Sequence, residues 1–128
     1  MIVLDTHAWI WWVSESKNLS APARKAIASA NTVGIHPISC WELAMLVEKQ
    51  RLALNCDVEQ WVTTALLMPN VICVDLVPAA AVLAARLPGD FHGDPADRLI
   101  VASCLLLAVP LVTKDSHIRR WRRIKTIW

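Results

Sequence analysis

The chain begins with MIVLD, from Met1 to Asp5, in which four apolar residues are followed directly by an acid. The run from Ile2 to Leu4 predicts a short buried strand, and Asp5 then stands at its carboxyl end. No basic segment precedes the run and a charge ends it, so it does not have the pattern of a secretory signal. These residues indicate a sheet with an acid at one edge.

The same kind of apolar run recurs along the chain. Further strands are predicted at Thr32 to Ile35, Val71 to Val74 and Pro110 to Thr113, with a fainter pattern at Ile124 to Ile127. Helical periodicity separates them, over His7 to Val13, Ser20 to Ala30, Ser39 to Arg51, Val58 to Met68, Pro78 to Leu87 and Asp94 to Ala108. This alternation predicts an α/β fold, with a central, mostly parallel sheet of four to five strands flanked by helices. A site in such a fold lies beyond the carboxyl ends of the strands.

Length and composition predict one domain, residues 1–128, because a chain of this length with 55% hydrophobic residues can fill a single core. The longest apolar run, Leu99 to Val112, is shorter than the roughly 20 residues that cross a bilayer. We therefore expect a cytoplasmic protein without membrane contact. Buried, reduced thiols are expected because no paired spacing of a zinc or redox site occurs among Cys40, Cys56, Cys73 and Cys104.

The formal net charge of +2 is too small to identify a nucleic-acid-binding protein. Basic residues nevertheless gather near the C-terminus, at Arg119, Arg120, Arg122, Arg123 and Lys125. This cluster is either a surface that contacts phosphates or an ordinary solvated helix end.

Acids follow the predicted strands at several places. Asp5 ends the first strand and Asp115 follows the strand Pro110 to Thr113, and each is also in position to cap the next helix. Glu42 follows Ser39 by three residues, which is the spacing of a capping box, and this places it in the first turn of a helix. Taken singly, each acid has a structural explanation.

The two acids of the segment His92-Gly93-Asp94-Pro95-Ala96-Asp97 have different explanations. Asp94 has the sequence context of an N-cap, since Pro95 suits the first helical position. Asp97 lies in the first turn, where the helix dipole contributes only about 0.3 to 1 kcal/mol and does not require a carboxylate. A functional role is favoured for Asp97, and the four acids Asp5, Glu42, Asp97 and Asp115 are expected at one edge of the sheet.

Carboxylates brought this close repel one another unless a cation neutralises them. No Cys/His set accompanies the acids, and all-oxygen ligation favours Mg²⁺, with Mn²⁺ as a substitute. Such an ion activates water and stabilises the departing oxygen of a phosphodiester. His7 and His117 lie next to proposed acids and are candidate proton carriers.

Three tryptophans fall in the first predicted helix, at Trp9, Trp11 and Trp12. They either stack on bases, pack in the core or form an interface with another protein, and the interface is the favoured interpretation.

In the order and spacing of its motifs the chain resembles the PIN-domain toxins of bacterial type II toxin–antitoxin systems, the VapC-like ribonucleases. The matching motifs are Leu4-Asp5-Thr6-His7, Ser39-Cys40-Trp41-Glu42, Asp94-Pro95-Ala96-Asp97-Arg98-Leu99-Ile100 and Leu111-Val112-Thr113-Lys114-Asp115.

The resemblance implies a PIN-like three-layer fold and Mg²⁺-dependent endonuclease activity on RNA. It also implies a homodimer and inhibition by a small cognate antitoxin, for which Trp9, Trp11 and Trp12 are candidate contacts. Asp5, Glu42 and Asp97 match the family's three acids and Asp115 its more variable fourth. Thr6, Asp94 and Thr113 are expected to support them.

Two other classes fit less well. A haloacid-dehalogenase-like phosphatase has a second Asp two residues after its nucleophile, where this chain has His7. A non-catalytic interaction module would use the acids only as helix caps.

Overall fold

Five short strands form one all-parallel sheet in the order β3-β2-β1-β4-β5 in the computed structural model, which describes residues 1–128. The central strand β1 places Leu4 beside Ile35 of β2 and Val112 of β4. The predicted α/β class and parallel sheet are confirmed. The strand bounds are β1 Ile2–Leu4, β2 Val33–Ile35, β3 Val71–Cys73, β4 Leu111–Val112 and β5 Thr126–Ile127.

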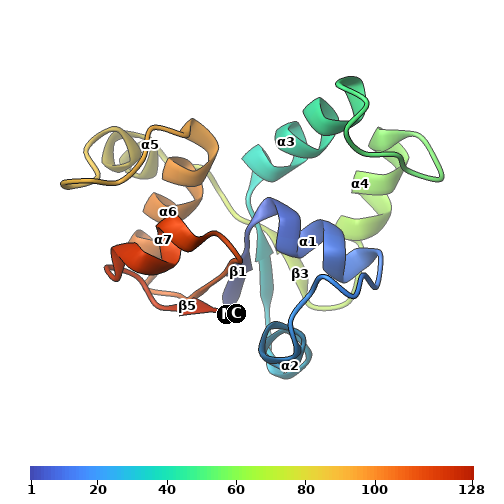
Figure 1. Ribbon diagram of the computed structural model, residues 1–128, viewed down its shortest axis with the longest axis horizontal. Coiled ribbons are helices and arrows are strands. Elements are labelled where there is room, and N and C mark those ends of the chain that lie inside the picture. The colour runs from blue at the N-terminus through green and yellow to red at the C-terminus, as the bar shows by residue number, and fades with distance from the viewer.

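Helices cover both faces of this sheet. Figure 1 shows α1, α3 and α4 on one side of the strands and α5, α6 and α7 on the other. Each predicted helix is present, although most are slightly shorter than predicted. The helix bounds are α1 Thr6–Val13, α2 Ala21–Ser29, α3 Pro37–Glu48, α4 Val58–Leu66, α5 Pro78–Ala85, α6 Pro95–Leu107 and α7 Ser116–Trp121.

Two apolar clusters, one on each face, hold the layers together. Ile2 and Leu4 pack in the cluster that includes α1 to α4, whereas Val3 packs in the cluster that includes α6. Successive side chains of a strand point to opposite faces, so a strand covered on both sides is apolar throughout. The run from Ile2 to Leu4 therefore fixes β1 at the centre of the sheet.

The start of α3 differs from the capping box predicted at Ser39. His36 is the N-cap, its Nδ1 accepting the N–H of Ile38 at 3.1 Å, and Pro37 opens the helix. Ser39 is buried within the first turn, and Glu42 lies in the second turn rather than the first. The prediction was wrong because a Ser and a Glu three residues apart also occur inside helices, whereas Pro37 marks the first helical position.

Two further sequence predictions need correction. Trp9 is fully buried, with its ring 5.1 Å from that of Trp61, so it is a core residue and not part of an interface. Trp11 and Trp12 remain partly exposed. All four cysteines are free, but Cys73 is exposed while Cys104 is buried, so the expectation of buried thiols does not hold for the whole set. None of the helices combines the length and the apolar character that crossing a bilayer requires.

Candidate metal centre

A pocket of about 450 Å³ opens where β1 and β4 end and α1, α6 and α7 begin. It brings together all four acids predicted from the sequence, although they are far apart in the chain. The parallel strands explain this convergence, because their carboxyl ends share one edge. The lining residues are Asp5, Thr6, His7, Trp11, Glu42, Asp94, Asp97, Lys114 and Asp115.

Three of these acids are N-caps, each through one oxygen, Oδ1. Asp5 caps α1, Asp94 caps α6 and Asp115 caps α7. The second carboxylate oxygen of each takes no part in the capping bonds. The capping bonds run from the N–H of Ala8 to Asp5 (2.8 Å), from Ala96 and Asp97 to Asp94 (2.9 and 3.1 Å), and from His117 and Ile118 to Asp115 (2.7 and 3.0 Å).

Two buried threonines, Thr6 and Thr113, also contact acids of the site. The Thr6 hydroxyl donates to Oε1 of Glu42 and lies 3.0 Å from the Ser39 hydroxyl, which links α1 to α3. Thr113 accepts the N–H of Asp115 at 3.0 Å, and its hydroxyl stabilises the charged form of Asp5. Thr6 lines the pocket, whereas Thr113 lies behind it, fully buried.

The acids are electrostatically coupled. The pKa of Asp97 is raised to about 8, mainly by burial and in addition by the charges of the neighbouring acids Asp94, Glu42, Asp115 and Asp5. Burial also raises the pKa of Glu42 and of Asp5 above their ordinary values. The charged form of Asp97 is therefore disfavoured both by burial and by the like charges around it.

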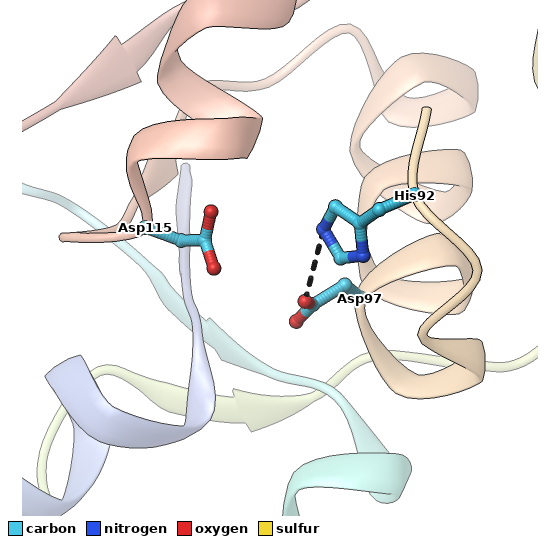
Figure 2. Close-up of side chains that lie close together, drawn as sticks. All are labelled: His92, Asp97 and Asp115. Carbon is cyan, nitrogen blue, oxygen red and sulfur yellow. Dashed lines mark ion pairs between the residues drawn. The ribbon is translucent and has the colours of Figure 1, made fainter. Parts of the chain in front are cut away.

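His92, which the sequence analysis did not select, completes the cluster. Its Nε2 lies 3.3 Å from Oδ2 of Asp97, and Figure 2 shows this pair facing Asp115 across the site. Nδ1 accepts the N–H of Asp94 at 3.3 Å, which leaves Nε2 as the ring nitrogen that faces Asp97. The residue follows no strand and begins no helix, so no periodic pattern marked it.

The side chains present suit a divalent cation. One possible donor atom from each of His92, Asp97 and Asp115 lies within 4.8 Å of the others, and Asp5 and Glu42 line the same pocket. Carboxylates supply most of these donors, which is the chemistry preferred by Mg²⁺ and Mn²⁺. Part of the rise in the pKa of Asp97 comes from repulsion by the neighbouring acids, and a bound cation would offset that part.

The two predicted proton carriers lie in different places. His7 lines the acidic pocket, while His117 lines a neighbouring cavity of about 210 Å³ with His92, Arg120 and Trp121. Arg120 is 3.3 Å from Nδ1 of His117. All five basic residues of the C-terminal cluster are exposed, which agrees with either interpretation of that cluster.

Comparison with known proteins gives concordant matches. Residues 2–124 match the PIN domain. The chain is 40% identical to Ribonuclease VapC22 of Mycobacterium tuberculosis over 129 positions, covering 99% of this chain and 98% of that protein. VapBC2 from Rickettsia felis, bound to a promoter DNA fragment, has a similar fold, with 16% identity, a TM-score of 0.69 and coverage of 98% and 97%. DNA-bound VapBC from Salmonella typhimurium also has a similar fold, with 18% identity, a TM-score of 0.66 and coverage of 98% of this chain and 95% of that one.

Proposed function

The chain belongs to the PIN-domain family, whose members are metal-dependent nucleases, and from this premise we propose that it is an endoribonuclease acting as a toxin of the VapC type. The observation that carries the proposal is the acidic pocket at the carboxyl edge of the sheet. The name of the relative, Ribonuclease VapC22, supports RNA as the substrate. Neither the phosphatase nor the non-catalytic module finds support in these matches.

Asp5, Glu42, Asp97 and Asp115 would hold a divalent cation, which we propose is Mg²⁺, with Mn²⁺ as a substitute. The bound ion supplies a water of lowered pKa and charge stabilisation for the departing oxygen. The chain itself does the positioning: Thr6 holds Glu42, Thr113 supports the charged form of Asp5, and His92 faces Asp97. Asp94 acts mainly as the cap of α6.

An antitoxin is the proposed protein partner, since the structural relatives are VapBC complexes. We place its contact on the partly exposed Trp11 and Trp12, with an Arg or Lys directed at the acids. Trp11 lines the acidic pocket, so a segment lying there blocks access of RNA. Trp9 is not part of this surface because it is buried. The proposed location of the pair is the cytoplasm.

A homodimer is the proposed assembly. Large apolar side chains are exposed along β3, α5 and the end of α6, among them Ile72, Val82, Leu106 and Leu107. Exposed apolar surface of this kind marks interaction sites. We expect Leu106→Glu to convert a dimer into a folded monomer in sedimentation equilibrium, with Lys25→Glu on the surface of α2 as the control. A wild-type chain that sediments as a monomer at all concentrations would contradict the dimer.

The catalytic assignment is tested by Asp5→Asn and Asp97→Asn. Each substitution removes a ligand charge but keeps the shape of the side chain, so RNA cleavage in Mg²⁺ should fall by at least about 100-fold, the cost of losing several kcal/mol of transition-state stabilisation. The far-ultraviolet circular dichroism of both variants should match that of the wild type. Cleavage at the wild-type rate by either purified variant would overturn the assignment of these carboxylates to the catalytic site, and absence of cleavage by the wild type would overturn the proposed function.

A further inference from the structure

Lys114 is the one Lys or Arg side chain among the residues that line the acidic pocket. It lies between two residues of the site, Thr113 at the end of β4 and Asp115 at the cap of α7. Its backbone is therefore held at the edge where the acids gather. A cation fixed at this point has either a structural role toward the acids or a role toward a ligand.

No carboxylate uses this cation. The structure has one pairing of a basic with an acidic side chain within 4.0 Å, that of His92 and Asp97, and Lys114 takes no part in it. Its Nζ lies instead 5.6 Å from the centre of the Trp11 ring. An ammonium on the face of an indole is attracted by the ring's quadrupole and keeps its N–H donors free.

The indole that holds Lys114 is itself fixed by other rings. Trp11 is 5.8 Å from the ring of Trp128 and 5.6 Å from that of His7. These contacts join α1 to the C-terminal residue and limit the rotamers that Trp11 can adopt. The Lys114 ammonium is thus positioned by its contact with the Trp11 ring and not by an ion pair with the acids beside it.

We propose that Lys114 binds a non-bridging phosphate oxygen of the RNA strand at the carboxylate site, and that Trp11 positions its ammonium for this contact. The proposal rests on the ribonuclease function proposed above. RNA approaching the pocket brings negative charge toward five acids, and a cation not neutralised by those acids is the group that can receive it. Lysine acts as a compact point charge in phosphate binding, with three donors.

The test measures the salt dependence of RNA binding. For single strands, the slope of log K against log salt changes by about 0.7 for each phosphate contact. Lys114→Met should flatten the slope by about this amount for a labelled single-stranded RNA, measured by fluorescence anisotropy at one fixed Mg²⁺ concentration in the Asp97→Asn background. Lys114→Arg should keep the slope. Lys25→Met, an exposed lysine on α2 that does not line the pocket, should also keep it.

Trp11→Leu tests the positioning role. It removes the ring face but leaves the lysine, so with Asp97 intact it should lower kcat/KM less than Lys114→Met does. Adding it to Lys114→Met should cause little further loss, since the ring then has no ammonium to hold. Independent, multiplicative losses would contradict the positioning role of Trp11.

The outcomes separate this inference from the proposed function. If Asp97→Asn abolishes cleavage but Lys114→Met leaves the salt slope unchanged, the phosphate contact is wrong and the ribonuclease assignment stands. If Lys114→Met weakens antitoxin binding and leaves the RNA slope unchanged, the cation serves the protein partner and the inference is equally overturned. If the wild-type protein does not cleave RNA in Mg²⁺, the ribonuclease assignment itself is wrong.

Discussion

At the scale of single residues, helix capping and metal binding are compatible roles for the same carboxylate. Asp5, Asp94 and Asp115 each cap a helix through Oδ1 alone. Capping restrains each side chain at the start of its helix, and all three residues line the pocket. In a parallel α/β fold the helix starts and the site share one edge, so a residue that caps a helix there is already placed for the site.

Asp97 should make the metal-free protein less stable as the pH rises. Its folded pKa of about 8 lies above the unfolded value near 3.8, so between these values the folded state keeps a proton that the unfolded state has lost. Unfolding free energy therefore falls across this window, by about 2 to 4 kcal/mol after allowance for partial exposure and shared charge. Thermal melts at about pH 5 and about pH 8 measure it.

Two further samples make this measurement specific to Asp97. Asp97→Asn should melt higher than the wild type at the alkaline end and show a shallower pH dependence, because it has no charge to bury. Saturating Mg²⁺ should raise the alkaline melting temperature of the wild type and change that of Asp97→Asn less. A variant that melts lower than the wild type at the alkaline pH would show that the carboxylate is stabilising, against the pKa argument.

At the scale of elements, the start of α6 carries two acids with different roles. Asp94 is the N-cap, and Asp97, three residues later, is the proposed metal ligand. Asp94→Ser should retain most activity and stability, because Ser caps nearly as well as Asp. Asp97→Ser should lose activity by at least about 100-fold with little loss of stability. Steady-state cleavage and melting temperature of the two variants give the comparison. Equal, large losses of activity at unchanged melting temperature would move Asp94 into the metal site.

How far the sequence predicts an element depends on how local its signal is. Strands β1 and β4 were found because apolar runs ending in acids are local patterns, and the acids at their ends were selected for that reason. Glu42 was selected by its motif although its helix starts earlier than predicted. His92 and Lys114 carried no such signal. Lys114 contacts Trp11, which is far away in the chain, and His92 faces Asp97 only because of the way the loop before α6 is folded.

At the scale of the whole molecule, α1 serves two surfaces at once. Its apolar residues run all round the helix, so periodicity did not show which tryptophan faces the core. In the structure Trp9 packs against α4, whereas Trp11 lines the acidic pocket and Trp12 is partly exposed. The same helix therefore carries part of the core, one wall of the site and the surface proposed for the antitoxin.

This division predicts different phenotypes for neighbouring tryptophans. Trp9→Ala empties a buried aromatic position and should lower the free energy of unfolding by about 3 to 5 kcal/mol. Trp12→Ala removes a partly exposed ring, so it should lower stability less while weakening the antitoxin complex by about 1 to 2 kcal/mol, or 5- to 30-fold in Kd. RNA cleavage should be little changed, because Trp12 does not line the pocket. Denaturant melts, cleavage rates and titration calorimetry on the same samples measure all three. If Trp12→Ala binds the antitoxin as tightly as the wild type while Trp41→Ala, an exposed ring beside Glu42 on α3, binds it more weakly, the partner covers α3 and the proposed surface on α1 is wrong.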